Sequence, residues 1–255
     1  MIHIKKPAEI EEMKLAGKIS AKALRKTGEL VRPGISTLDL DRFAEEYIRM
    51  QGATPAFLGY GGFKGSICAS INDAIVHGIP GEDKILQEGD IISIDTGAVI
   101  GGWVGDNAWT YAVGEIDAET QRLLEVTEQS MWAGIDQARS GNHLEDIGHT
   151  VQTVAEGAGF GVVREYVGHG VGHDMHEDPN VPNFGRKGRG PKLKAGMVIA
   201  IEPMVCAGTF RTRGPYPEEG GWTVYTADGK CAAHFERTVA IQADGAPLIL
   251  TSEEW

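Results

Sequence analysis

The chain has 255 residues, 42% of them apolar and 24% charged, a composition typical of a globular protein and not of a disordered one. Acidic residues outnumber basic ones by 36 to 24, and the formal charge of −12 argues against a binder of DNA or of anionic membranes, because phosphate contacts need a basic face. Three scattered cysteines exclude a disulfide framework and a C-x-x-C zinc site.

The start of the chain carries no predicted export or membrane segment. Acidic residues stand where a signal peptide would need its apolar stretch. No run approaches the ~18 apolar residues that a membrane span requires. Together with the cysteine content, this predicts a cytoplasmic protein, and we expect a monomer.

Two helices are predicted first. From Pro7 to about Val31 apolar side chains recur at helical spacing, with a proline near the first turn. The second helix begins at the capping pattern Ser36-Thr-Leu-Asp39 and ends at Gly52. Strands are predicted next, at about 66–71, 90–97 and 106–113.

The same order of elements recurs in the second half of the chain. Helices are predicted at about 118–138 and 143–157, followed by strands at about 162–167, 197–206, 222–226 and 233–242. Helices followed by mostly antiparallel strands are typical of an α+β fold.

An internal repeat accounts for this order. The pattern L-x-x-G-x-[IV]-I-x-I-[DE] begins at Leu86 and again at Leu193, an offset of 107 residues. Two further pairs share the offset: Arg32-Pro-Gly34 with Arg139-Ser-Gly141, and Gly52 with Gly159. We therefore predict a single domain over residues 1–255, built from two pseudo-symmetric copies (about 10–113 and 117–243) around one curved sheet.

Four carboxylates are predicted to meet at strand ends. Asp95 ends one apolar strand and Asp106 opens the next. A hairpin centred between Ile100 and Gly101 would place the two carboxylates directly opposite, with Cβ atoms about 5 Å apart. Like charges at that distance are destabilising unless a cation lies between them.

The repeat extends this prediction to the second half. Glu202 is the counterpart of Asp95 and also ends an apolar strand, so its hairpin partner should be acidic. Glu236 is the candidate, reached through a connection with 23 additional residues. Two-fold related strands would bring all four carboxylates together.

A histidine adds a fifth donor to this cluster. His169 is flanked by glycines, and Gly170 and Gly172 exclude a zincin-like H-E-x-x-H helix, as does the lack of a Glu after His169. Four further histidines are interpreted as surface or helix-face residues: His3, His143, His149 and His234. One nitrogen and four carboxylates favour hard to borderline divalent ions, and two such ions with a bridging hydroxide indicate hydrolysis.

Several motifs stand in family-like order over nearly the whole chain: Ile71-Asn-Asp-Ala-Ile-Val-His77-Gly-Ile-Pro80, Ile94-Asp95, Gly105-Asp106, Gly168-His-Gly-Val-Gly172, His176-Glu-Asp-Pro179, Ile201-Glu202-Pro-Met204 and Phe235-Glu236. The set resembles type I methionine aminopeptidase, in metallopeptidase family M24. The resemblance implies the two-copy pita-bread fold and removal of the initiator methionine from nascent proteins, through a hydroxide activated by two metal ions.

The resemblance also implies residue roles. Five side chains would hold two divalent ions (Co, Mn, Fe, Zn or Ni), with Asp106 and Glu236 bridging: Asp95, Asp106, His169, Glu202 and Glu236. His77 would contact the scissile nitrogen and His176 the carbonyl oxygen, while Glu202 would shuttle a proton to the leaving amine. An apolar methionine pocket would be lined by Phe57, Tyr60, Phe63, Cys68, Met175 and Trp222. Phe57 and Met175 depart from the residues frequent in the family, so the shape of the pocket stays open.

The expected partners are nascent chains that start with methionine and a small second residue. The basic stretch from Arg186 to Lys194 has two interpretations, a solvated loop or a transient contact with the ribosome. Three alternatives to the aminopeptidase stay open at this point: a prolidase or aminopeptidase P relative on the same fold, a metal-free binding module and a dinuclear nuclease.

Overall fold

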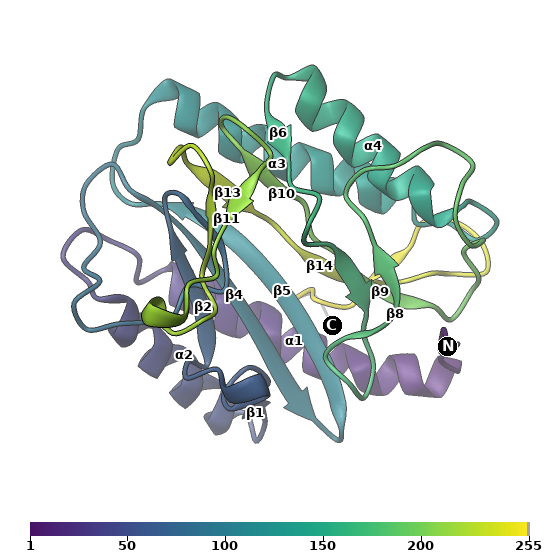
Figure 1. The fold of residues 1–255 in the computed structure, drawn as a ribbon. Helices are drawn as coiled ribbons and strands as arrows, with labels where there is room; N and C mark the ends of the chain where they lie inside the picture. The colour runs from purple at the N-terminus through teal and green to yellow at the C-terminus, as the bar shows by residue number, and fades with distance from the viewer. Residues whose placement is uncertain (254–255) are drawn as a thin grey trace.

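The computed structural model describes residues 1–253 and has the expected α+β composition (Figure 1). Within this part of the chain the α-helices are α1 (Pro7–Gly28), α2 (Thr37–Met50), α3 (Ala118–Gln137) and α4 (Leu144–Gly157). All four predicted helices are confirmed, and α1 ends at Gly28, slightly before the predicted Val31. None of the helices in the described residues is long and apolar enough to cross a membrane.

The helix starts follow from local capping. The Ser36 hydroxyl accepts a hydrogen bond from the Asp39 N–H at 3.0 Å, as the capping pattern predicts. The Asp117 carboxylate does the same for the Thr120 N–H at 2.9 Å, at the start of α3. Each cap satisfies an N–H group that has no partner inside its helix.

The first half of the chain contributes five strands and one 3-10 turn. They are β1 (Thr54–Pro55), η1 (Tyr60–Gly62), β2 (Ile67–Ile71), β3 (Ala74–Val76), β4 (Ile91–Ile100) and β5 (Trp103–Ala112). The ten-residue strands β4 and β5 form a long antiparallel hairpin that crosses the middle of the molecule in Figure 1, and β1 and β2 pair with β4.

The second half contains shorter strands. They are β6 (Gly161–Val162), β7 (Gly168–Gly170), β8 (Glu177–Val181), β9 (Val198–Ile201), β10 (Met204–Cys206), β11 (Thr212–Arg213), η2 (Pro217–Glu219), β12 (Val224–Thr226), β13 (Ala232–His234), β14 (Arg237–Ala240) and β15 (Leu248–Ile249). All pairings among the described strands are antiparallel. Their hydrogen bonds form four sets of strands: β1-β4-β2 with β5, β13-β10-β6, β11-β12-β3 and β15-β14-β9-β7-β8.

Three strand predictions need correction. The segment 162–167 is extended only at β6, and 197–206 and 233–242 are each interrupted at an acidic residue, Glu202 and Glu236. Pro203 follows Glu202 and has no N–H to continue a ladder, which explains one interruption. The register nevertheless continues across the gap, because Ile201 pairs with Arg237 and Met204 with His234.

The register of the β4–β5 hairpin also differs from the prediction. Gly101 and Gly102 form the turn, with φ of 59° and 80°, and Ile100 pairs with Trp103. The predicted centre would have put Ile100 into the turn, where a β-branched residue is disfavoured at positive φ. As a result Asp106 lies opposite Gly97, and Asp95 opposite Ala108.

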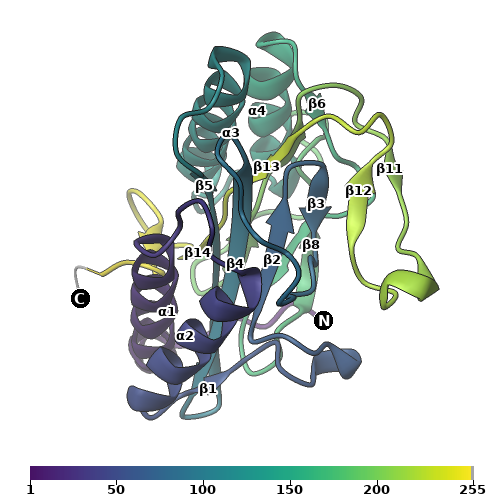
Figure 2. The ribbon, with the colours of Figure 1, turned by 90° about the vertical axis from the view of Figure 1, so that its left-hand side faces the viewer.

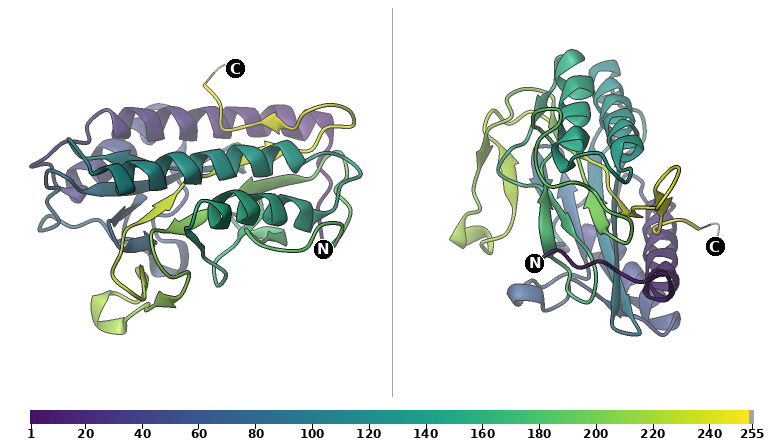
Figure 3. Two further views of the ribbon diagram at one scale, coloured as in Figure 1. Left: turned by 90° about the horizontal axis from the view of Figure 1, so that it is seen from above. Right: turned by 90° about the vertical axis from the view of Figure 1, so that its right-hand side faces the viewer.

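The helices lie together on one side of the strands, and the segment with β11, β12 and η2 projects on the other side (Figures 2 and 3). Helix α1 packs on β4 and β5, and α3 packs on β9, β10 and β13. The approach of α1 is close, because a Cβ atom at Gly105 would lie 2.5 Å from the backbone of Ala16 and Gly17. The site must therefore lie on the face of the hairpin that α1 leaves free.

Candidate metal centre

A cavity of about 310 Å³ lies on that free face. It combines acidic and imidazole side chains at one end with apolar and aromatic side chains at the other. The thirteen residues that the sequence singles out for a site all line it: Phe57, Tyr60, Phe63, Cys68, His77, Asp95, Asp106, His169, Met175, His176, Glu202, Trp222 and Glu236.

The alternation of strand β5 aims Asp106 into this cavity. The side chain of Asn107 points to α1, where its Nδ2 donates to the Ser20 hydroxyl at 2.8 Å. Successive side chains of a strand point to opposite faces, so Asp106 points away from the helix. Asp95 lies opposite Ala108 and therefore on the face of Asp106, so the two carboxylates are diagonal neighbours. The prediction that they share a face is confirmed, whereas the directly opposite pairing was wrong.

The strand interruptions place the other two carboxylates. Glu202 follows β9 and Glu236 precedes β14, and the shared register puts them across from each other. The Glu236 N–H donates to the carbonyl of Ala108 at 2.9 Å, which ties the second half of the chain to β5. Asn183 Nδ2 donates to the Glu202 carbonyl at 3.0 Å and fixes the interruption after β9.

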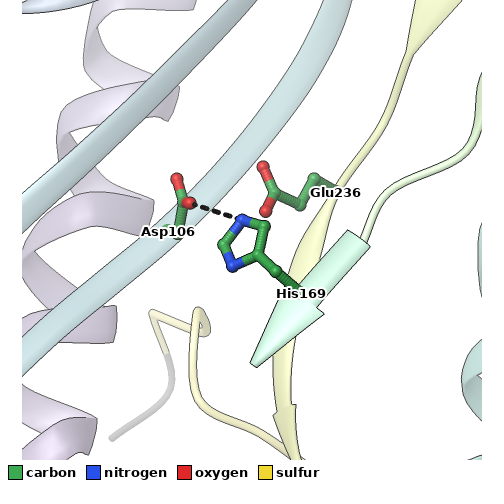
Figure 4. Close-up of side chains that lie close together, drawn as sticks. All are labelled: Asp106, His169 and Glu236. Carbon is green, nitrogen blue, oxygen red and sulfur yellow. Dashed lines mark ion pairs between the residues drawn. The ribbon is translucent and has the colours of Figure 1, made fainter. Parts of the chain in front are cut away.

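His169, on β7, closes the cluster from a third direction. Its Nε2 lies 3.6 Å from Asp106 Oδ2 and 3.4 Å from Glu202 Oε1. Donor atoms of Asp106, His169 and Glu236 all lie within 4.8 Å of one another, and Figure 4 shows these three side chains converging. The His169 Nδ1 lies 2.9 Å from the Gly170 carbonyl, so Nε2 is the nitrogen left for a ligand.

Burial sets the proton affinities of the carboxylates. It raises the pKa of Asp106 to about 7, and it raises the pKa values of Asp95 and Glu236 well above their ordinary range, with the Asp106 charge adding to both. Burial acts in the same direction on Glu202, but the hydrogen bond and charge of His234 and the charge of His169 outweigh it, and the pKa of Glu202 is lowered. Without a cation this cluster is therefore poorly compensated.

Three buried carboxylate oxygens have no hydrogen-bond partner: Asp95 Oδ1, Asp106 Oδ1 and Glu236 Oε1. Such atoms cost free energy in a folded protein unless an ion or water satisfies them. Carboxylate oxygens and one imidazole nitrogen, with no thiolate among them, are the donors that hard to borderline divalent ions prefer. The residues of this cluster therefore fit a divalent metal ion.

Two more histidines face the cavity beside the cluster. His77 has a φ of 59° and its ring is held edge-on between Tyr166 and Trp222, with centroids 5.8 Å and 6.2 Å away. His176 stands at the mouth, its Nδ1 2.8 Å from the Tyr60 hydroxyl. Burial lowers the pKa of each imidazole to about 4, so both are neutral near pH 7.

The other end of the cavity is apolar. Phe57, Phe63, Cys68 and Met175 are buried there, and Trp222 packs edge-on against Phe63 at 5.3 Å. Gly97 provides the room, because a Cβ atom at this position would lie 3.0 Å from both the Met175 methyl group and the Phe57 ring. The additional residues of the second-half connection supply one wall, since β12 pairs with β3 and thereby brings Trp222 to His77.

The interpretation of His234 as a surface residue was wrong. His234 is 2% exposed, and its Nε2 lies 3.3 Å from Glu202 Oε2. The signal was available in the sequence, because His234 stands two residues before Glu236 on a strand and so shares its face. Tyr166 was also missed, and no sequence pattern distinguishes it from other aromatic residues. His3, His143 and His149 are exposed or half-buried, as predicted.

A second, larger cavity of about 490 Å³ lies between α1 and α3, on the helical side of the molecule. It contains Arg237, Arg25 and Glu253 together with Trp109 and other aromatic residues. It holds neither the carboxylate cluster nor the neutral histidines, so the smaller cavity is the candidate for chemistry.

Comparison with known proteins agrees with this geometry. Residues 11–243 match the model of metallopeptidase family M24. A methionine aminopeptidase of Clostridium acetobutylicum is 53% identical over 98% of this chain and 99% of its own length, and methionine aminopeptidase 1 of Bacillus subtilis is 51% identical with the same coverage. The crystal structure of methionine aminopeptidase from Thermotoga maritima superposes with a TM-score of 0.96 at 45% identity and covers 99% of this chain and 100% of that one.

Prolidases share the fold at lower similarity. The prolidase from Pyrococcus furiosus aligns with a TM-score of 0.78 and 25% identity, over 99% of this chain but 66% of its own. The two-part antiparallel architecture is thus common to both groups, whereas the length of this chain matches the methionine aminopeptidases.

Proposed function

This chain belongs to metallopeptidase family M24 and is a metal-dependent aminopeptidase that removes N-terminal methionine, and we propose that five side chains hold two divalent ions for this reaction. They are Asp95, Asp106, His169, Glu202 and Glu236. One observation supports the proposal above all: Asp106 and Glu236, each with a buried carboxylate oxygen that has no hydrogen-bond partner, converge with His169, and donor atoms of the three residues lie within 4.8 Å of one another. A divalent ion supplies an activated water and polarises the carbonyl group of the substrate when it is bound there.

Glu202 is suited to move a proton. Its lowered pKa keeps it ionised near pH 7, so an oxygen of its carboxylate can accept a proton from water and deliver it to the leaving amine. His234 Nε2 lies 3.3 Å from Glu202 Oε2, and the charge of His234 favours the ionised form of this carboxylate. We expect Glu202 to combine this role with metal binding.

His77 and His176 are suited to bind the reacting peptide group. Both are neutral near pH 7 and retain an N–H donor. His77, fixed between Tyr166 and Trp222, would contact the scissile nitrogen. His176 would donate to the carbonyl oxygen as negative charge develops on it, oriented through its Nδ1 by the Tyr60 hydroxyl.

The apolar end of the cavity is suited to the methionine side chain. Phe57, Phe63, Cys68, Met175 and Trp222, with Tyr60 at the mouth, present aromatic and sulfur surfaces that suit a thioether. The acidic end would attract the free α-amino group, which restricts cleavage to the first peptide bond. Closely packed walls at Gly97 predict that longer or branched first residues are excluded.

Release of methionine from a Met-Ala-Ser peptide tests the proposal. Protein freed of metal with a chelator should be inactive, and activity should return with Mn(II), Co(II) or Fe(II), in a titration that saturates at two equivalents. Asp117→Ala, which removes the cap of α3 far from the cavity, is the matched control and should retain activity. Faster cleavage of X-Pro than of Met-Ala peptides would instead indicate a prolidase.

We also propose that the basic loop 186–194 contacts the ribosome and that the enzyme is a monomer. The five basic residues of this loop are exposed and take part in no ion pair with any described residue: Arg186, Lys187, Arg189, Lys192 and Lys194. Backbone hydrogen bonds to α4 hold the loop, from the Arg186 N–H to Glu145 and from the Gly188 N–H to Asp146. A fixed cluster of cations suits ribosomal RNA in an otherwise acidic protein.

Co-sedimentation with ribosomes tests this second proposal. Replacing the five basic residues with glutamine should reduce pelleting and its dependence on salt, while hydrolysis of a free Met-Ala-Ser peptide stays unchanged. Pelleting equal to that of the wild type would contradict it.

A further inference from the structure

The loop 172–177, between β7 and β8, carries two of the proposed site residues. Met175 lies buried in the apolar end of the cavity and His176 stands at its mouth. Residues 172–176 form bends and only Glu177 belongs to a strand, so neither side chain is held by a helix or by the interior of a strand. Something else must fix their positions.

Glu177 closes this loop with its own carboxylate. Its Oε1 accepts hydrogen bonds from the His173 N–H at 2.9 Å and, at the limit of this interaction, from the Asp174 N–H at 3.5 Å. Gly172 makes the closure possible, because a Cβ atom there would lie 2.0 Å from the same oxygen. This oxygen therefore shapes the turn that precedes Met175 and His176, together with contacts to the hairpin: His173 Nδ1 lies 2.7 Å from the Gly102 carbonyl, and the Val104 N–H donates to the Gly172 carbonyl at 3.0 Å.

The second oxygen of Glu177 is held by the N-terminal segment. Lys5 Nζ lies 2.6 Å from Glu177 Oε2, and the two side chains are only 2% and 13% exposed. Lys5 is itself fixed, because its N–H donates to the Gly196 carbonyl at 2.7 Å just before α1 begins. A buried ammonium group is costly without a paired acid, so this geometry is strongly determined.

We propose that Lys5 and Glu177 are positioning residues for methionine removal, in which the buried ion pair holds the 172–177 loop so that Met175 and His176 face the substrate. This inference rests on the roles proposed above for Met175 and His176. It assigns a function to the segment before α1, which lies outside both copies of the predicted repeat. Neither Lys5 nor Glu177 lines the cavity, so their effect must act through the loop.

Kinetics of Met-Ala-Ser hydrolysis by the metal-loaded enzyme test the inference. Lys5→Met removes the charge at nearly constant volume. It should lower kcat/KM by about 10- to 100-fold, with a higher KM from displaced Met175 and a lower kcat from displaced His176. Glu177→Gln should act similarly. The kcat/KM of the double variant should be no lower than that of the less active single variant, because the two residues act as one unit.

Asp117→Ala serves as the control for stability. It should lower the melting temperature while leaving KM and kcat unchanged at 25 °C, so a general loss of stability cannot mimic the expected split. Wild-type kinetics in Lys5→Met, or losses that multiply in the double variant, would overturn the inference.

Hydrogen exchange separates this inference from the proposed function. Lys5→Met and Glu177→Gln should each accelerate amide exchange in residues 172–177, because the His173 N–H loses a fixed acceptor. If the wild-type enzyme released no methionine, the proposed function would fail, and the exchange measurement would still decide whether the ion pair holds the loop. Unchanged amide exchange of residues 172–177 in Lys5→Met would contradict the inference.

Discussion

The two halves of the molecule support their carboxylates differently. Asp95 and Asp106 stand inside a continuous hairpin of two ten-residue strands, closed by a two-residue turn. Glu202 and Glu236 stand at interruptions, where each strand leaves one sheet and enters another. The first half thus carries its carboxylates within regular strand pairing. The second half carries them where the hydrogen-bonded pairing of the strands is interrupted.

The charges around Glu202 differ from those around the other three carboxylates. Burial raises the pKa values of Asp95, Asp106 and Glu236, and the charge of Glu202 adds to the rise in all three. Glu202 has His169 and His234 within 3.4 Å, and its pKa is lowered although it is equally enclosed. One site can therefore combine carboxylates of two kinds: three that need a cation, and one, Glu202, that stays ionised and is suited to proton transfer.

The largest expected effect comes from removing a carboxylate of either half. Asp106→Asn should lower kcat/KM on Met-Ala-Ser by at least about 10³-fold, since loss of a direct ligand exceeds the 10- to 100-fold typical of residues that only support ligands. Glu236→Gln should cost about as much, because each residue contributes one of the unpartnered oxygens. Metal content measured after dialysis should fall in both variants.

If only one of these two variants lost metal, the proposal that both halves of the molecule hold the metal would be contradicted. Asp117→Ala is the control, since it changes an exposed acid that caps α3. Wild-type activity in Asp106→Asn would contradict the proposed centre.

A smaller effect is expected at His234, which distinguishes the second half. His234→Gln removes the partner of Glu202 Oε2, and it should lower kcat/KM by about 10- to 100-fold, the range typical of residues that orient a ligand. His143→Gln is the matched control, because its side chain lies outside the cavity. Activity should be measured as a function of pH, since Glu202 without His234 should be protonated at higher pH. Equal activity of the two variants would show that Glu202 needs no such partner.

Much of this candidate site could be predicted from the sequence, because Asp95 and Glu202 end apolar strands 107 residues apart, and Asp106 and Glu236 follow as their hairpin partners. The identity of the strand-end acids required only pattern and spacing. The predicted hairpin register was wrong because several glycines surround the turn. The turn falls at Gly101 and Gly102, which both adopt positive φ, and composition alone does not show which of the glycines do so. The role of Lys5 was not predictable, because it depends on a contact between residues 172 positions apart.

In the metal-free protein, the ionisation of Asp106 in the first half should make the free energy of unfolding depend on pH. The pKa of Asp106 is raised to about 7 in the folded protein from an ordinary 3.8. Below pH 4 both states hold the proton, and between pH 4 and 7 only the folded state does, so Asp106 contributes stability that the metal-free protein loses as pH rises through this window. His77 and His176, with pKa values of about 4, act in the opposite direction below pH 6.5, so the contribution of Asp106 is measured against Asp106→Asn. Glu202, with its lowered pKa, is ionised in both states above pH 5 and adds no slope.

The expected loss between pH 5 and 7 is about 1–3 kcal/mol, at 1.36 kcal/mol for each unit of pKa. It is measured by denaturant unfolding in a chelator. Metal-loaded protein should show the opposite trend, because metal binding requires deprotonated ligands. Metal-free wild type should therefore lose about 1–3 kcal/mol more between pH 5 and 7 than metal-free Asp106→Asn, and equal profiles of the two proteins would contradict the assignment.

The smallest expected effect tests the hairpin that carries the first pair. In the observed register Gly102 is a turn residue with a φ of 80°, so Gly102→Ala should destabilise the protein by about 1 kcal/mol. In the register predicted from the sequence Gly102 would lie in a strand opposite Val99, and alanine would be neutral or stabilising. The sign of the change therefore decides between the two registers. Space is not limiting, since the nearest atom to a new Cβ is His173 Nδ1 at 3.6 Å. The free energy of unfolding, measured by denaturant unfolding, should therefore fall by about this amount, because only the turn conformation changes.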